Sequence, residues 1–421
     1  MNRERLVAGL DIGSAKTTAI IAEVVGELPR RPSIRVLGVG QARTTGLRRG
    51  VVADIEETTR SIRKAMEEAE RMAGAKVESV YVGIAGEHVQ AMTSKGIVAV
   101  NGDEIAKPDV DRANEVARAQ AIPQDRELLH AIPQEYTVDR AAGIQDPIGM
   151  IGMRLETEMY LVTIGSSPAM NLRKSVERAG YKVKELVLEP LASALSVLTE
   201  DEKELGVALV EMGAGTTDMA IFHEGKIRHL GTIAYGGNNV TSDLVHGLGL
   251  TQADAERLKE AYGVAYEPMV DPGEVVQLPG TVAQGERQIP RELMAHIIHQ
   301  RLDEIFDLVQ REITTAGYAG KLSGGVVVTG GAAEMAGVAE LASDVFGTGV
   351  RVGTLASAIG GLRETIEAPR FSTVVGLALY GAHRVALGGA AAAAGGKRIH
   401  PPSPGFDKLA QRVKTWLQDF F

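Results

Sequence analysis

The sequence predicts an α/β fold with a duplicated domain, an inserted subdomain and a separate C-terminal element. The duplication is indicated by residues 6–21 and 207–222, which share one pattern: an apolar run typical of a buried strand, then an acid, a glycine turn and hydroxyl residues. Three pairs of positions align at a constant offset of 200 residues: Asp11 with Glu211, Gly13 with Gly213, and Thr17 with Thr217. We therefore expect two similar loops that face one ligand from opposite sides.

The residue types in these two stretches suit a polyphosphate. Small residues let backbone N–H groups approach phosphate oxygens closely, and threonine hydroxyls add donors. The acids would repel phosphate unless a divalent cation lay between them, so the pattern indicates Mg²⁺. Neither stretch is a P-loop, and Asp218 stands where a dinucleotide fingerprint needs its third glycine. Because a glycine-rich turn after a strand is often only a turn, the prediction rests on the repeat.

Composition limits the function classes. The chain has 421 residues, a net charge of −9 and no cysteine. Its length allows two or three domains. The acidic balance argues against nucleic acid as a partner, and the lack of cysteine removes disulfides and cysteine zinc sites. Because no apolar run reaches the ~20 residues needed to span a bilayer, we expect a cytosolic body.

Changes in composition along the chain predict its division into segments. Residues 86–158 are rich in Pro, Gly and Gln, contain no phosphate-type loop and interrupt the first domain. Helices expected near 189–198 and 371–378 carry small residues that suit close crossing, as a hinge between the duplicated halves. The predicted segments are 1–85 and 159–203 for the first domain, 86–158 for the insert, 204–354 for the second domain, 355–387 for helices closing the first, 388–405 for a flexible linker, and 406–421 for a terminal helix.

Further residues are candidates for the ligand site. Glu189 stands where a strand gives way to a helix, a common place for active-site groups, although a solvated acid at a helix start fits the same pattern. Glu256 and Lys259 lie one helical turn apart and could hold ribose hydroxyls, although an ordinary surface pair is the commoner arrangement. Gly330 and Gly331 follow a buried strand and would let a flat base or a phosphate lie against the backbone.

The C-terminus predicts a tether and a membrane-surface helix. Residues 388–396 hold five alanines between glycine pairs, and prolines follow, as in a linker that is first flexible and then stiff. Apolar residues of 406–421 fall within one arc of about 140° on a helix: Phe406, Leu409, Ala410, Val413, Trp416, Leu417, Phe420 and Phe421. A helix of about 24 Å is too short to cross a core of ~30 Å, so it would lie in the interface; the alternative is docking on the protein itself or on a partner.

Five short motifs stand in a familiar order: D-I-G-S at 11–14, E-P-L-A-S-A at 189–194, E-M-G-A-G-T-T-D at 211–218, A-E-R-L-K at 255–259 and T-G-G-A-A-E at 329–334. Together they resemble the actin-type ATPase superfamily, with its duplicated actin/ribonuclease-H-like fold. Three further features indicate one family within this superfamily: the place of the insert, T-S-D-L at 241–244 and the amphipathic C-terminus. Along nearly its whole length the chain resembles the FtsA family of bacterial cell-division proteins.

The resemblance implies ATP and Mg²⁺ as cofactors and a role for each matching position. Asp11, Gly13, Ser14, Ala15, Lys16 and Thr17 would form one phosphate loop, and Gly213, Ala214, Gly215, Thr216 and Thr217 the other. Asp11, Glu211 and Asp218 would hold Mg²⁺ through water. Glu256 and Lys259 would take the ribose, Gly330, Gly331, Ala332 and Glu334 the adenosine, and Glu189 would lie near the attacking water.

The resemblance also implies a cellular role. The family is an actin-like, filament-forming adaptor that tethers the FtsZ ring to the cytoplasmic face of the inner membrane at the division site and recruits later division proteins. Arg291 and Arg301 match basic positions that would pair with the FtsZ C-terminal tail, unless they are ordinary solvated arginines. The terminal helix would bind membrane lipid.

Two departures bear on catalysis. Glu211 stands where the superfamily usually has Asp, and Ala214 where a third glycine is common. One extra methylene moves a carboxylate by about an ångström, and catalysis is sensitive to shifts of that size. We therefore expect at most slow ATP hydrolysis, with binding retained. The alternatives are a small-molecule kinase of the same fold, for which the insert offers no clear catalytic Asp, and a PilM-like pilus protein, which lacks the amphipathic tail.

Overall fold

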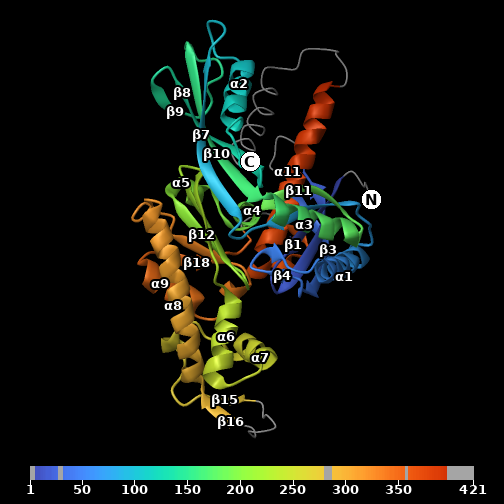
Figure 1. The fold of residues 1–421 in the computed structure, drawn as a ribbon, viewed down its shortest axis with the longest axis vertical. Helices are drawn as coiled ribbons and strands as arrows, with labels where there is room; N and C mark the ends of the chain where they lie inside the picture. Colours follow the sequence, from blue (N-terminus) through green and yellow to red (C-terminus); the bar gives the residue numbers. More distant parts are fainter. Residues whose placement is uncertain (1–4, 27–31, 279–286, 356–358, 396–421) are drawn as a thin grey trace.

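The fold has two similar halves, with a subdomain inserted in the first (Figure 1). It is seen in a computed structural model that describes residues 5–26, 32–278, 287–355 and 359–395. The first half is built on a six-stranded sheet. In spatial order its strands are β11 (Lys182–Leu188), β6 (Ser79–Ile84), β1 (Leu6–Ile12), β2 (Lys16–Val25), β3 (Ser33–Arg43) and β19 (Gly360–Gly361).

Helices cover both faces of this sheet. Alternate side chains of a strand point to opposite faces. Leu10 therefore packs with α1 (Ile55–Ala73) and α3 (Ser166–Ala179), whereas Val7 packs with α4 (Glu189–Val197) and α11 (Ser372–Gly395). Helix α1 begins at Asp54, whose carboxylate accepts a hydrogen bond from the Glu57 N–H at 3.0 Å, and it ends at Gly74 in the left-handed conformation.

The second half repeats this arrangement around a five-stranded sheet. Its strands, in spatial order, are β14 (Lys226–Ile233), β13 (Thr217–His223), β12 (Val207–Met212), β17 (Val326–Thr329) and β18 (Val350–Val352). One face packs in an apolar cluster with α6 (Gly237–Leu248), α7 (Gln252–Tyr262), α8 (Arg291–Thr315) and α9 (Val338–Phe346). The other face packs against α4, whose apolar cluster also includes side chains of the first sheet. Helix α4 therefore lies between the two halves.

The pairing register shows how closely the halves correspond. Strands β1 and β2 are antiparallel with Ile12 opposite Thr17, and β12 and β13 pair with Met212 opposite Thr217. Each hairpin turn is closed by an equivalent backbone hydrogen bond, from Gly13 N–H to the Lys16 carbonyl at 3.0 Å and from Gly213 N–H to the Thr216 carbonyl at 2.9 Å. The offset of 200 residues seen in the sequence is thus kept in the strand register and in the turns.

The inserted subdomain rises from the end of the first sheet (Figure 1). It is a four-stranded sheet, β7 (Val89–Ala99), β10 (Arg154–Gly165), β8 (Arg126–Val138) and β9 (Ala141–Ile144), with helix α2 (Lys107–Arg118) packed on it. Helix and sheet approach closely at Gly96, where an added Cβ would lie 2.0 Å from the Ala113 carbonyl oxygen. The buried Asp109 holds the first turn of α2 by accepting a hydrogen bond from the Ala106 N–H at 2.9 Å.

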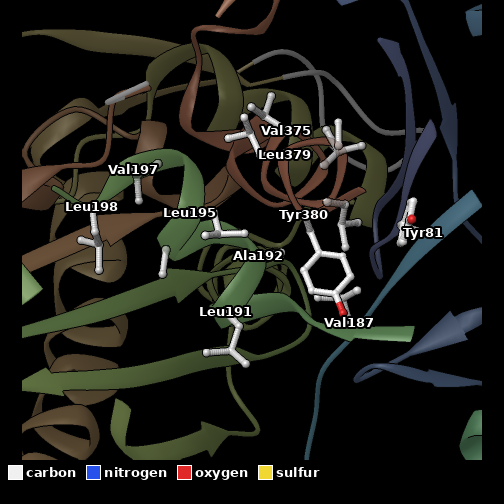
Figure 2. Packing of buried hydrophobic residues seen from close by; sticks show 14 of the residues in the cluster. Tyr81, Val187, Leu191, Ala192, Leu195, Val197, Leu198, Val375, Leu379 and Tyr380 are labelled. Carbon is white, nitrogen blue, oxygen red and sulfur yellow. The ribbon is translucent and has the colours of Figure 1, made fainter. Parts of the chain in front are cut away.

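Helices α4 and α11 cross at a point where small residues let the two backbones meet. A Cβ added to Gly376 would lie only 1.8 Å from the Ala192 carbonyl oxygen. The Ser196 hydroxyl donates to the Ser372 carbonyl at 2.7 Å. Figure 2 shows apolar side chains of both helices, among them Leu195 and Leu379, in the surrounding cluster. The predicted crossing of the two small-residue helices is present.

The C-terminal helix α11 differs from the prediction. Helix α11 continues to Gly395, so residues 388–395, which we expected to be flexible linker, are helical. The five alanines explain this, because alanine has the highest helix propensity. The predicted membrane helix 406–421 lies outside the described residues. Among those described, no helix combines the length and apolarity needed to cross a membrane. Short elements complete the fold: α5 (Glu200–Leu205), α10 (Arg363–Ile366), β4 (Leu47–Arg48), β5 (Val51–Val52), β15 (Val275–Leu278) and β16 (Arg287–Pro290).

Candidate functional site

A cavity of about 660 Å³ is lined by residues of both halves. Most of the residues predicted for the ligand site line it. They are Asp11, Gly13, Ser14, Ala15 and Lys16 from the first turn, Glu211, Gly213, Ala214, Gly215, Thr216 and Asp218 from the second, and Glu189, Glu256, Lys259, Gly330, Gly331, Ala332 and Glu334. The fold thus brings together side chains that are more than 300 residues apart in the chain.

The two duplicated turns face each other across this cavity at close range. A Cβ added to Gly215 would lie 2.6 Å from the Ser14 hydroxyl oxygen, so only glycine leaves the space open. Opposed turns with closely approaching backbones form a cradle that suits phosphate groups, because backbone N–H groups of such turns bind anions.

Two predicted residues do not belong to the cavity. Thr17 is fully buried on the opposite side of β2, where its hydroxyl is 2.7 Å from that of Thr44 and 3.0 Å from that of Ser61. Thr217 is equally buried and donates to the Tyr235 carbonyl at 2.9 Å. Because side chains alternate along a strand, the neighbouring residue lines the cavity instead, Thr18 in the first half. The assignment of Thr17 and Thr217 to the phosphate loops is therefore corrected.

Four carboxyl groups gather at the phosphate end of the cavity. Burial raises the pKa of Asp11 to about 7 and that of Glu211 to about 8. Burial, together with the neighbouring Asp11, Glu211 and Asp218, raises the pKa of Glu189 well above its usual value. Burial also raises the pKa of Asp218. Such a cluster binds either protons or a cation at neutral pH, since uncompensated buried charges are costly.

Hydroxyl groups orient two of these acids. Ser193 donates to Glu211 at 2.9 Å, and Thr373 of α11 donates to the other oxygen of the same carboxylate. Thr216 and Thr232 donate to the two oxygens of Asp218, at 2.8 and 2.6 Å. Sequence reasoning missed Ser193, Thr232 and Thr373 as partners of the acids, because they lie on other elements, between 14 and 162 positions from the acids they contact.

The cluster fits a divalent cation held through water. Among the described residues, no three acids or histidines lie close enough to bind a metal directly. Mg²⁺ commonly keeps several of its waters and uses few protein ligands, so outer-sphere binding by Asp11, Glu211 and Asp218 suits the donor set. A cation beside these groups would favour their charged forms and oppose the effect of burial.

Glu256 and Lys259 form an i,i+3 pair on α7, as the simpler interpretation expected, but the pair also lines the cavity. The Lys259 ammonium donates to Glu256 at 2.8 Å, to the Thr241 hydroxyl at 2.8 Å and to the Gly237 carbonyl at 3.1 Å. Its side chain is only 10% exposed. These three acceptors fix the Lys259 ammonium at the cavity wall. The Glu256 carboxylate beside it can accept hydrogen bonds from the hydroxyl groups of a ligand.

The glycine pair after β17 also lines the cavity. Gly330 has a φ of 89° and lies against the Met212 backbone, where a Cβ would be 2.6 Å from the carbonyl oxygen. Gly331 has open space on its side-chain position. Glu334 is tied to Arg370, whose backbone N–H donates at 3.1 Å and whose Nε donates at 2.7 Å. Arg370, which also lines the cavity, was not foreseen from the sequence.

The two arginines predicted to bind a partner tail both have carboxylate partners within the protein. Arg291 pairs with Glu274 at 2.5 Å and donates to the Tyr262 carbonyl at 3.1 Å. Arg301 makes two hydrogen bonds to Asp243, at 2.5 and 3.1 Å, and contacts Glu304. Both guanidinium groups are thus paired within the protein, and a carboxylate of a partner would have to compete for them or join them.

Comparison with known proteins decides the family. Two family models match, "Cell division protein FtsA" over residues 208–376 and "SHS2 domain inserted in FTSA" over residues 86–163. The cell division protein FtsA of Pseudomonas aeruginosa is 39% identical over 419 residues, which cover 99% of this chain and 98% of that relative. The chain belongs to the FtsA family. The second model matches the insert of this FtsA-family chain.

Solved structures show that this FtsA-family chain has the actin-like ATPase fold. A PilM–PilN type IV pilus biogenesis complex matches with a TM-score of 0.62 at 17% identity, covering 89% of this chain and 98% of that chain. MreB5 of Spiroplasma citri bound to ADP matches with a TM-score of 0.52 at 15% identity, covering 89% and 95%. At these identities the likeness concerns the fold alone, and the fold class predicted from the sequence is confirmed.

Proposed function

We propose that this protein binds Mg²⁺–ATP in the cavity between its two halves. The observation that carries the proposal is the pair of equivalent turns, closed by the same hydrogen bond and separated only by the space that Gly215 leaves open. Backbone N–H groups of both turns and Lys16 would hold the phosphates. Glu256 and Lys259 would take the ribose, and Gly330, Gly331, Ala332 and Glu334 the adenosine. The fold it shares with an ADP-bound MreB5 supports the nucleotide class.

We propose that hydrolysis, if it occurs, is slow. Mg²⁺ would supply charge stabilisation at the phosphates, while Glu211, Asp11 and Asp218 orient it through water. Glu211 is fixed by Ser193 and Thr373, so its longer side chain cannot shift freely to restore the position of a shorter Asp. Since positioning supplies most of the catalysis in phosphoryl transfer, a displaced acid lowers the rate before it lowers affinity. Glu189 would lie near the attacking water, as one of the buried acids around the phosphates.

The cellular role that we propose follows from family membership: an actin-like adaptor that joins the FtsZ ring to the cytoplasmic face of the inner membrane, polymerises and recruits later division proteins. On this proposal the FtsZ tail binds beside α8. Arg291 and Arg301 would contact its carboxylates while keeping Glu274 and Asp243 as their own partners, since a guanidinium has five N–H donors.

Membrane attachment would depend on residues 406–421, beyond the described part of the chain. Their apolar positions, Phe406, Leu409, Val413, Trp416, Leu417, Phe420 and Phe421, would enter the interface of the bilayer. Three basic residues in this segment are offset by two aspartates and the terminal carboxylate, so apolar burial would dominate over attraction to anionic lipid. Trp416 would be the interfacial anchor.

Co-sedimentation with liposomes, with and without FtsZ and ATP, tests this function. The full chain should sediment with lipid and carry FtsZ with it. Truncation after Pro404, or Trp416→Glu, should abolish sedimentation while the circular dichroism spectrum of the folded body is kept. If the truncated protein still sediments as fully as the intact chain, the terminal segment is not the anchor. If the intact chain sediments but leaves FtsZ in solution, the adaptor role fails.

The two alternative functions have less support. Family membership over nearly the whole chain sets this protein apart from pilus proteins, to which it is similar in fold alone. A small-molecule kinase would need a catalytic carboxylate facing a second substrate, and the acids described at the phosphate end, Asp11, Glu189, Glu211 and Asp218, form one cluster around the proposed cation.

A further inference from the structure

The hairpin β4–β5 carries an arginine in a backbone conformation that arginine rarely adopts. Leu47 pairs with Val52 and Arg48 with Val51, so the turn consists of Arg49 and Gly50 alone. Both have positive φ, 48° and 74°. This is the type I′ pattern, in which Asn, Asp or Gly usually occupies the first position. A left-handed backbone is unfavourable for arginine because its Cβ lies too close to the following carbonyl oxygen, and asparagine adopts this conformation more readily.

The turn formed by Arg49 and Gly50 lies where the two halves contact each other. A Cβ added to Gly215, in the second phosphate-type turn, would lie 3.3 Å from the Arg49 Cα. A Cβ on Gly86 would lie 3.2 Å from the Arg49 carbonyl oxygen, and one on Gly50 would lie 2.5 Å from the Ala85 carbonyl oxygen. Arg49 therefore sits on the first half with its backbone against a loop of the second.

The base of the hairpin is fixed to the first phosphate-type turn and to α1. Thr44 N–H donates to the Ala15 carbonyl at 2.9 Å. The Gly46 carbonyl accepts hydrogen bonds from the N–H groups of Ala53 and Asp54, at 2.8 and 3.0 Å. The hairpin is thus a rigid support that holds Arg49 at the rim of the cavity, next to Gly50, which lines it.

Acidic side chains outnumber basic ones at this end of the cavity. Among the described lining residues are the acids Asp11, Glu189, Glu211 and Asp218, while the base at the phosphate turns is Lys16, whose ammonium lies 4.0 Å from the Glu260 carboxylate. The other lining bases have carboxylate partners: Lys259 with Glu256, Arg370 with Glu334, and Arg291 with Glu274. Within the described part of the chain, no carboxylate forms an ion pair with Arg49, and its side chain is exposed.

We propose that Arg49 is a phosphate-contacting residue that reads the terminal phosphate of a bound nucleoside triphosphate. This inference rests on the proposed function. On this proposal the Arg49 guanidinium lies over Gly215 and pairs with oxygens of the terminal phosphate, in the bidentate geometry that arginine favours with phosphate. Because its backbone touches Gly215 and Gly86, the same contact links the state of the nucleotide to the fit between the two halves.

Affinity for two nucleotides, measured on the full chain by titration calorimetry, tests this role. The ligands are Mg²⁺–ADP and the magnesium complex of a non-hydrolysable ATP analogue. Arg49→Asn should weaken binding of the triphosphate about tenfold or more, the loss expected for a charged hydrogen-bonding partner, and leave ADP affinity unchanged. Arg49→Lys, which keeps the charge but loses the fork, should fall between. Arg48→Ala is the matched control, an exposed arginine on the same hairpin, and should change neither affinity.

Thermal unfolding of the nucleotide-free variants separates contact from support. Arg49→Asn should unfold at the same temperature as the wild type or above it, because asparagine tolerates the turn conformation better. Equal losses for ADP and the triphosphate, a lowered unfolding temperature with no nucleotide preference, or an Arg48→Ala effect as large as that of Arg49→Asn would each overturn the assignment. A wild type that binds neither nucleotide would refute the proposed function, and a wild type that binds both while Arg49→Asn changes neither would refute this inference alone.

Discussion

Replacing Glu211 by Gln should stabilise the nucleotide-free protein at alkaline pH. Burial and the neighbouring Asp11 and Asp218 outweigh the Thr373 and Ser193 hydroxyls and raise the pKa of Glu211 to about 8. A carboxyl of raised pKa keeps its proton in the folded chain after the unfolded chain has released it. The free energy of unfolding therefore falls as pH rises between the two pKa values, by about 1.4 kcal/mol per pH unit. From about pH 5.5 to about pH 8 this amounts to roughly 3 kcal/mol for one such group.

Urea unfolding at these two pH values, followed by far-ultraviolet circular dichroism, measures the effect. Gln carries no charge at either pH, so the advantage of Glu211→Gln over the wild type should grow by about 3 kcal/mol from the lower to the higher pH. Any constant cost of the amide, such as a poorer hydrogen bond from Ser193 or Thr373, cancels in this comparison.

Asp109→Asn is the matched control for this measurement. Asp109 is also buried, but the Ala106 N–H donates to it, and its pKa is lowered. Its contribution to stability is present above the usual pKa of an aspartate and is lost only as pH falls below it, so Asp109→Asn should cost the same at both pH values. If Glu211→Gln behaves like Asp109→Asn, with no change between the two pH values, burial and the neighbouring acids do not raise the pKa of Glu211 and the reasoning fails.

Three further predictions concern the helix crossing, the tail site and the rate of hydrolysis. Gly376→Val should destabilise the fold by about 1–3 kcal/mol or more, because its side chain would overlap the Ala192 carbonyl where α4 and α11 cross; thermal unfolding unchanged from the wild type would contradict that packing. Arg301→Glu should weaken binding of an FtsZ tail peptide and leave ATP affinity alone, and unchanged peptide affinity in both Arg301→Glu and Arg291→Glu would disprove the tail site. Steady-state ATP turnover should fall below the ~1–100 s⁻¹ of ordinary kinases, and turnover within that range would refute slow hydrolysis.

The local chemistry of the chain was enough to predict the duplicated turns. The acid, the glycines and the buried strand before them lie within a few residues, so their pattern repeats visibly at 200 residues, and the structure keeps that offset in the register of β1–β2 and β12–β13. The close crossing of α4 and α11 was also predicted from small residues alone. Features of this kind can be predicted because they depend only on residues close together in the sequence.

Three differences between the prediction and the structure have separate physical causes. Thr17 and Thr217 were grouped with their turns although strand alternation turns them into the core. The partners of the acids could not be found locally, since Thr373 and Glu211 are 162 positions apart and come together only when α11 crosses α4. The helical 388–395 shows a third cause, because glycine pairs suggested a linker while the alanines between them favour helix.

Binding of a fluorescent ATP analogue with Mg²⁺ or with EDTA tests the central claim most directly, that the two turns form one Mg²⁺–nucleotide site. The wild type should bind saturably with Mg²⁺ and lose binding in EDTA. Asp218→Ala should abolish binding, and Gly215→Ala should weaken it strongly, because its Cβ would meet the Ser14 hydroxyl. Gly331→Ala, in the same cavity but with open space at its Cβ, should bind like the wild type. If Asp218→Ala and Gly215→Ala both still bind the analogue, in EDTA as well as with Mg²⁺, the account is contradicted.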